Sequence, residues 1–140
     1  MSDKFFIDTN IFVYSLDRSA PAKSQKAAQL IRRALATQKG VVSYQVVQEF
    51  FNVALKRFAQ PMKAVDAELY LAGVFRPLLA VHSSPALFVE ALHIHAGTGF
   101  SWYDSLIVAG AIQVKCDLLY TEDLHHGQQI GSLRIVNPFV

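Results

Sequence analysis

The sequence predicts an α/β fold in which a mostly parallel sheet of about five strands lies between layers of helices. Two observations carry this prediction. Short apolar segments of strand length recur along the chain, and segments with helical periodicity separate each one from the next. Strands buried on both faces, as in a parallel sheet, are short and continuously apolar. Helices that alternate with them supply the crossovers that parallel pairing needs.

The strands are expected at the apolar runs. The first reads Phe-Phe-Ile and opens the chain, and the second reads Val-Val-Ser after the break at Gly40. In chain order the expected strands are residues 5–7, 41–43, 79–82, 118–120 and 134–136. Runs of this length fit strands better than helices, which need about ten residues or more.

Helices are expected between those strands. Residues 23–37 are amphipathic, with an apolar stripe made of Ala27, Leu30, Ile31, Ala34 and Leu35. Ser84 and Pro85 favour a helix start, because serine caps helix N-termini and proline is favoured at the first helical position. The expected helices cover residues 23–37, 45–58, 62–75, 86–95 and 101–115.

The composition indicates a globular chain. Of its 140 residues, 52% are hydrophobic and 17% charged, so we expect a single domain over residues 1–140 with a real core. The net charge of +2 permits a nucleic-acid partner but does not argue for one. We expect no signal peptide, no membrane association and a cytoplasmic location. The longest apolar run, residues 106–112, is far below the roughly 20 residues that span a bilayer, and the lone Cys116 excludes an internal disulfide.

A polar triplet, Asp8-Thr9-Asn10, interrupts an otherwise apolar opening directly after the first expected strand. Ligands of open α/β sheets bind beyond the carboxyl ends of the strands, so chemistry is expected at this point. The residues alone leave a second interpretation open, in which Asp8 and Asn10 cap or turn the chain into the next helix.

Three more acids stand in notable places. Asp104 has apolar neighbours on its helical face, although Ser101 and Asp104 also match a capping box. Asp123 follows the fourth strand beside Glu122, where a solvated turn is the alternative. Glu49 lies on a polar helical stripe, and periodicity by itself favours a solvated face there.

Together these acids predict a metal site. Two carboxylates about 4 Å apart repel by roughly 4 kcal/mol at an effective dielectric near 20, so without compensation one would protonate. A divalent cation removes the conflict, and oxygen ligands suit Mg²⁺ or Mn²⁺. Such a site is suited to phosphodiester hydrolysis by a metal-activated water.

Four segments in order, "FFIDTNIFVYSLD", "SYQVVQEFFNV", "SWYDSLIVAGA" and "LLYTEDLHHGQ", resemble the PIN-domain nucleases, in particular the VapC-like toxins of toxin–antitoxin systems. The resemblance covers nearly the whole chain and ends with "RIVNPF" as the last strand. It implies a PIN-like three-layer fold, a Mg²⁺-dependent endoribonuclease (Mn²⁺ being possible) and control by a cognate antitoxin protein.

Carried over by position, the resemblance assigns the catalytic quartet to Asp8, Glu49, Asp104 and Asp123. The metal ligands would be Asp8, Asp104 and Asp123. Supporting polar roles fall to Thr9, Asn10 and Thr121. The resemblance thus reverses the periodicity argument for Glu49. Because alternate residues of an extended chain point to opposite sides, we expect Thr121 and Asp123 to face the metal and Glu122 to face solvent or a basic side chain.

Two other functions are alternatives to the nuclease. A phosphoacceptor receiver domain also gathers acids around Mg²⁺, but the phosphorylatable aspartate after the third strand and the lysine after the fifth are missing. A non-catalytic PIN-like binding module is the other rival, against which the complete quartet argues. The histidines of the pairs 93/95 and 125/126 do not have the spacing of a zinc site.

We further expect a homodimer and an antitoxin groove, because several helices are apolar over much of their circumference. The substrate is expected to be RNA, without an indication of which one. Basic residues look scattered along the chain and define no single stripe. They are Lys23, Lys26, Arg32, Arg33, Lys56, Arg57, Lys63 and Arg76.

Overall fold

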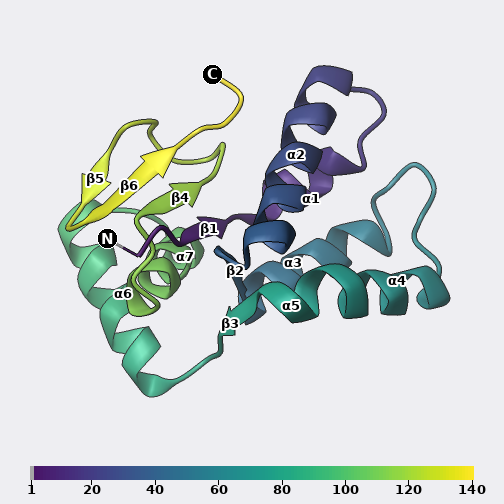
Figure 1. The fold of residues 1–140 in the computed structure, drawn as a ribbon. Helices are drawn as coiled ribbons and strands as arrows, with labels where there is room; N and C mark the ends of the chain where they lie inside the picture. The colour runs from purple at the N-terminus through teal and green to yellow at the C-terminus, as the bar shows by residue number, and fades with distance from the viewer. Residues whose placement is uncertain (1) are drawn as a thin grey trace.

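The computed structural model describes residues 2–140 and is built around a six-stranded sheet (Figure 1). The strands are β1 (Phe5–Ile7), β2 (Gly40–Ser43), β3 (Leu79–Val81), β4 (Leu118–Tyr120), β5 (Gln129–Ile130) and β6 (Leu133–Val136). Their order across the sheet is β3-β2-β1-β4-β6-β5. All neighbouring pairs are parallel except β5 and β6, which are antiparallel. The predicted α/β class and the mostly parallel sheet are confirmed.

The helices flank this sheet. They are α1 (Thr9–Ser15), α2 (Pro21–Thr37), α3 (Tyr44–Ala54), α4 (Ala64–Tyr70), the π-helix η1 (Leu71–Phe75), α5 (Arg76–Leu78), α6 (Pro85–Thr98) and α7 (Trp102–Gln113). Helices α6 and α7 pack against each other, as do α1 and α2. Side-chain hydroxyls of Ser43, Ser84 and Ser101 accept from backbone N–H groups in the first turns of α3, α6 and α7.

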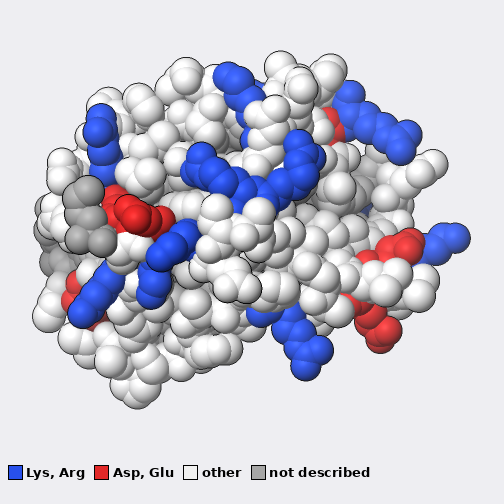
Figure 2. Space-filling model, viewed as in Figure 1, with Lys and Arg blue, Asp and Glu red and all other residues white. Residues whose placement is uncertain are grey.

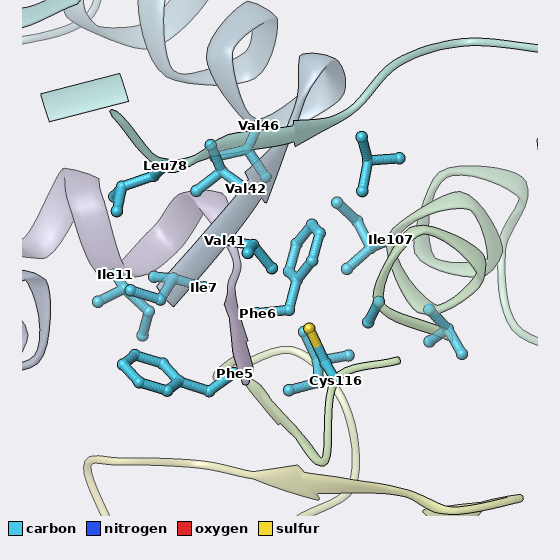
Figure 3. Packing of buried hydrophobic residues seen from close by; sticks show 14 of the residues in the cluster. Phe5, Phe6, Ile7, Ile11, Val41, Val42, Val46, Leu78, Ile107 and Cys116 are labelled. Carbon is cyan, nitrogen blue, oxygen red and sulfur yellow. The ribbon is translucent and has the colours of Figure 1, made fainter. Parts of the chain in front are cut away.

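The central strand β1 is buried on both faces, which explains its unbroken apolar sequence. Phe5 lies toward α2: a Cβ added at Gly40 would fall 2.2 Å from the Cβ of Ala34 in α2 and 3.2 Å from the Phe5 ring. Only glycine therefore permits this approach of α2 to the sheet. Phe6 lies on the other face, toward Gly110 of α7. Figure 3 shows Phe6 between Ile107 and the sheet.

The core continues to the start of β4. Cys116, immediately before this strand, is buried, and burial raises the pKa of its thiol to about 12. Figure 3 shows it among the buried core residues that include Phe6. No helix within residues 2–140 combines the length and the apolarity that crossing a membrane requires.

The expected element boundaries are partly wrong. The helix expected over 45–58 ends at Ala54, because the chain turns back there and the Met62 N–H donates to the Ala54 carbonyl at 2.8 Å. The helix expected over 62–75 begins at Ala64 and continues through η1 to Leu78. The helix expected over 86–95 extends from Pro85 to Thr98, where Gly99 ends it with φ +77°. The short strand β5 was not expected.

The connections create a switch point at the middle of the sheet. From β1 the chain passes outward to β2 and β3 on one side of the sheet. The connection from β3 to β4 on the other side is made by α6 and α7. The chain leaves β1 into α1 toward one side of the sheet, and it leaves β4 through a bend toward β5 and β6 on the other side, so the carboxyl ends of β1 and β4 meet at the switch point. This is where open α/β sheets bind their ligands.

Candidate active site

Asp8 occupies the switch point. It follows β1, and its N–H donates to the Tyr120 carbonyl at the end of β4, at 3.0 Å. One carboxylate oxygen accepts from the Thr9 N–H at 2.7 Å, which makes Asp8 the N-cap of α1. The other accepts from the Thr121 hydroxyl at 2.8 Å. The capping and the functional interpretations of Asp8 are thus compatible, since the cap aims the carboxylate toward β4.

The Asp8 carboxyl is an unusual acid. Its residue is only 5% exposed, and burial raises its pKa to about 7. The hydrogen bonds from Thr121 and Thr9 oppose the rise, whereas the negative charges of Glu49 and Asp123 add to it. Three acids therefore act on one another at this strand edge.

Glu49 is held by donors on both sides. The Thr9 hydroxyl donates to one of its oxygens at 2.6 Å, and the Gln45 amide donates to the other at 3.3 Å. The same amide group donates to the Tyr103 carbonyl at 3.1 Å, which ties α3 to α7. Glu49 is half-buried, so the solvated face suggested by periodicity is not what the fold produces.

Asp123 lies in the bend after β4 and is exposed. Its N–H donates to the Thr121 hydroxyl at 3.1 Å, and one carboxylate oxygen accepts from the Asn10 amide at 3.0 Å. The remaining Asn10 atom, Oδ1, is buried and has no hydrogen-bond partner among the described residues. An unsatisfied buried acceptor is uncommon, and this one belongs to the amide that binds Asp123.

Asp104 approaches from the other side, in the first turn of α7. Its N–H donates to the Ser101 hydroxyl at 3.1 Å, so the helix is capped through the backbone of Asp104. Partial burial raises the pKa of the carboxyl, the Ser101 hydroxyl lowers it, and the charge of Asp123 raises it again. Asp104 is therefore within electrostatic reach of Asp123.

Glu122 is bound elsewhere. Its two oxygens accept from the Tyr14 hydroxyl at 2.7 Å and from Lys23 Nζ at 2.6 Å. Partial burial acts to raise the pKa of Glu122, but the Lys23 and Tyr14 bonds outweigh it and lower the pKa overall. Glu122 thus faces a basic side chain, while Thr121 and Asp123 face Asp8 and Asn10.

Three acids, Glu49, Glu122 and Asp123, line an open hollow of about 520 Å³, which Asp8 and Asp104 do not line. Its lining residues are Thr9, Asn10, Val13, Tyr14, Glu49, Asn52, Val53, Glu122 and Asp123. Within residues 2–140, no three Asp, Glu, His or Cys side chains are close enough together to form a ready metal-coordination shell. Instead, Thr9 links Asp8 to Glu49, Thr121 links Asp8 to the backbone of Asp123, and Asp104 is connected to Asp123 by charge alone.

A sequence profile described as the PIN domain matches residues 5–128. The chain belongs to the PIN-domain family. A comparison with curated protein sequences gives no match.

Solved structures similar to this PIN domain extend over nearly all of it. A toxin–antitoxin complex from Klebsiella pneumoniae has a TM-score of 0.66 at 16% identity, covering 96% of this chain and 98% of the other. FitAB bound to a DNA fragment has a TM-score of 0.68 at 18% identity, covering 97% and 96%. VapC20 of Mycobacterium tuberculosis, a sarcin–ricin loop cleaving toxin, has a TM-score of 0.58 at 19% identity, covering 86% and 92%. At these identities the likeness shows the fold.

The donor set of this PIN domain suits a hard divalent cation. A cation beside Asp8 would offset both causes of its raised pKa, burial and neighbouring charge, and would favour the carboxylate form. The unpartnered Asn10 oxygen supplies a further neutral acceptor at the same place. Carboxylate and amide oxygens are the ligands that Mg²⁺ and Mn²⁺ prefer.

Two features of the site were missed from the sequence. Gln45 stands one helical turn before Glu49, a spacing at which side chains meet, and this i, i+4 pair is a signal that could have been used. The Tyr14–Glu122–Lys23 cluster joins three distant segments and leaves no such local signal.

Proposed function

We propose that this PIN domain is a Mg²⁺-dependent endoribonuclease and the toxin of a toxin–antitoxin pair, with Mn²⁺ able to replace Mg²⁺. The observation that carries the proposal is Asp8. A buried carboxyl stands at the sheet's switch point, near enough to Glu49 and Asp123 for their charges to raise its pKa. A cation would stabilise the charged form of this group, and three-acid cation sites are suited to phosphodiester hydrolysis.

The acids and their hydrogen-bond partners have different roles in this proposal. Asp8, Asp104 and Asp123 would hold the ion, which activates water and stabilises negative charge on phosphate oxygens when bound. Glu49 would orient the attacking water and accept its proton at a carboxylate oxygen. Thr9 and Gln45 fix that carboxylate from both sides, Thr121 fixes Asp8, and Asn10 fixes Asp123.

The receiver-domain alternative does not fit the topology. Receiver domains have the strand order 2-1-3-4-5, whereas this sheet has the order β3-β2-β1-β4-β6-β5. A PIN-fold binding module without catalysis is the remaining rival, and an activity measurement separates it from the nuclease.

The test is cleavage of a fluorescently labelled single-stranded RNA by purified protein. We expect cleavage with Mg²⁺, none with EDTA, and at least a hundredfold loss in Asp8→Asn. Asp66→Asn is a matched control, because Asp66 is an exposed acid on α4, remote from the hollow. Expression of the wild type should arrest growth, and Asp8→Asn should relieve the arrest. Equal cleavage by wild type and Asp8→Asn, in preparations free of contaminating nuclease, would show that the mechanism is wrong.

A groove lined by both apolar and charged side chains, Asp17, Arg18 and Arg57 among the latter, continues from the acid hollow, and we assign it to an antitoxin segment. Both hollows are lined by Val13 and Val53, and the groove, of about 760 Å³, adds Leu16 and Phe58. The solved toxin–antitoxin structures support a protein partner of this kind. A basic residue from that segment could neutralise the acids beside Asp8.

Substitution of Leu16 tests the groove. Leu16→Asp should weaken binding of the antitoxin encoded by an adjacent reading frame, because a charge would be buried in the groove. Leu71→Asp, on η1, is the control, because it alters a leucine of similar exposure, 40% against 43% for Leu16, that does not line the groove. Equal binding of the antitoxin by both variants would place its segment on another surface.

A homodimer remains the proposed assembly. Apolar side chains are exposed on α6 at Phe88, Val89 and Leu92, which are 39%, 52% and 54% exposed. Burying them against a second copy would remove apolar area from water. Light scattering at micromolar concentration should give twice the monomer mass, and a monomer there would contradict the assembly.

A further inference from the structure

Helix α2 carries a line of basic side chains that starts at the acid hollow. Lys23, Lys26 and Arg33 are three and seven residues apart, which places them on one face of the helix. They looked scattered in the sequence because the segments that complete the surface come from the other end of the chain. Figure 2 shows lysine and arginine side chains grouped over the part of the surface where α2 runs.

Lys23 lies where the line of basic side chains meets the acid hollow. Its ammonium group lies 2.6 Å from Glu122 and above the Tyr14 ring, 4.6 Å from the ring centre. It also lies 5.5 Å from the centre of the Phe139 ring, which packs edge-on against Tyr14. A basic group with two half-exposed aromatic rings therefore borders the hollow that holds Asp123.

Another hollow, separate from the acid hollow and from the antitoxin groove, continues the line of basic side chains along α2. Its lining residues are Lys26, Gln29, Leu30, Arg33, Tyr120 and Pro138. Pro138 adjoins Phe139, so the C-terminal segment forms one wall along both the Lys23 junction and this hollow. Arg33 donates to the Tyr120 hydroxyl at 2.9 Å and stacks over Phe5, 4.8 Å from the ring centre. Among the described residues, 2–140, no acidic side chain lines this hollow.

We propose that this surface, here called the α2 track and made of Lys23, Lys26, Arg33, Tyr120 and Phe139, binds the backbone of single-stranded RNA next to the cleavage site. The proposal rests on the proposed nuclease function. From Lys23 to Arg33 the helix rises by about 15 Å. That length matches roughly four nucleotides at the 3.4 Å spacing of a B-form strand, and fewer in an extended strand.

The chemistry favours a single strand over other polyanions. Basic side chains interleaved with partly exposed aromatic rings are the arrangement that holds phosphates and stacks unpaired bases. An acidic protein segment would use the charges but not the rings. The track also supplies the positive charge that the acid hollow lacks, because the carboxylates that line this hollow repel the phosphates that must reach it.

The test separates binding from cleavage. A fluorescein-labelled single-stranded RNA of 16 nucleotides is titrated with the Asp8→Asn protein in EDTA, and anisotropy is measured at several salt concentrations. Lys26→Gln with Arg33→Gln should weaken binding about tenfold at low salt. It should also reduce the slope of log K against log salt by about 1.4, since each phosphate contact on a single strand contributes about 0.7.

Arg32 provides a matched control. It follows the same helix but lies about 100° around it from Arg33, in a hollow with Asp17 and Arg18. Arg32→Gln with Lys63→Gln removes the same two charges away from the track and should leave affinity within twofold. Because Arg33 also packs on Phe5, circular dichroism must show folded variants, and Lys26→Gln alone should reduce the slope by about 0.7.

The outcomes distinguish this inference from the proposed function. If wild type cleaves RNA and the two double variants bind equally, the track is wrong and the nuclease stands. If the Asp8→Asn protein does not bind the RNA, the track is also wrong. If wild type neither binds nor cleaves, both proposals fail. Displacement of the RNA by poly-glutamate at equal charge concentration would assign the surface to an acidic protein and overturn the RNA assignment.

Discussion

The acid site has two unequal halves. Asp8 and Glu49 form an inner half, in which every carboxylate oxygen already accepts a hydrogen bond from a neighbouring side chain or backbone N–H. Asp104 and Asp123 form an outer half that is half-buried or exposed. The fold itself therefore fixes the inner acids, whereas the outer acids keep the freedom to adjust to an ion and a substrate.

The largest expected effect concerns the inner half and its pH dependence. In metal-free protein the Asp8 carboxyl has a pKa of about 7 when folded and an ordinary value of 3.8 when unfolded. Between these values the folded state binds more protons, so the free energy of unfolding falls as pH rises, by about 1.4 kcal/mol per pH unit and about 4 kcal/mol in total.

Urea unfolding in EDTA at pH 4 to 8 checks this slope. Asp8→Asn should flatten the curve between pH 4 and 7 and make the protein more stable at pH 8, even though it removes activity. Mg²⁺ should recover stability in the wild type and much less in the variant. An unchanged slope in Asp8→Asn would mean that another group causes the pH dependence.

The next effect separates two roles at the start of α7. Asp104→Asn should lower RNA cleavage at least a hundredfold, equivalent to about 2.7 kcal/mol in the activation barrier, while the fold is kept. Ser101→Ala removes the helix cap and should cost about 1 kcal/mol of stability with most activity retained. If Ser101→Ala were as inactive as Asp104→Asn, capping would explain the importance of this turn.

The smallest expected effect distinguishes the neighbours Glu122 and Asp123. Asp123→Ala should weaken Mg²⁺ binding and activity tenfold or more, because its carboxylate borders Asp8 and Asn10. Glu122→Ala should change both within a few-fold, because its partners are Tyr14 and Lys23. Parallel metal titrations of the two variants decide, and a larger loss in Glu122→Ala would reverse the assignment.

Sequence patterns predicted the centre of the sheet well because β1 and β2 are buried along their whole length and consist almost entirely of apolar residues. They missed β5, which has only two residues. A signal existed in Gly131-Ser132, a two-residue hairpin loop whose glycine has φ +59°, since such turns need positive φ.

The site was less predictable from local patterns. Periodicity placed Glu49 on a solvated face because its decisive partner, Thr9, is 40 residues away in the sequence. The sequence did not predict the α2 track for the same reason, because only the fold brings Tyr120 and Phe139 next to α2. Local patterns describe which face of a helix is polar, but they do not reveal which distant side chain that face meets.

The single buried thiol gives the molecule an internal reporter of its own opening. Thiol reagents react with the thiolate, and the pKa of about 12 at Cys116 leaves almost none of it at neutral pH in the closed state. Labelling must therefore wait until α7 and β4 separate. The labelling rate therefore measures how often this part of the core opens by local unfolding. A slower rate with Mg²⁺ would show that ion binding at the carboxyl end of β4 stabilises the whole strand against this opening.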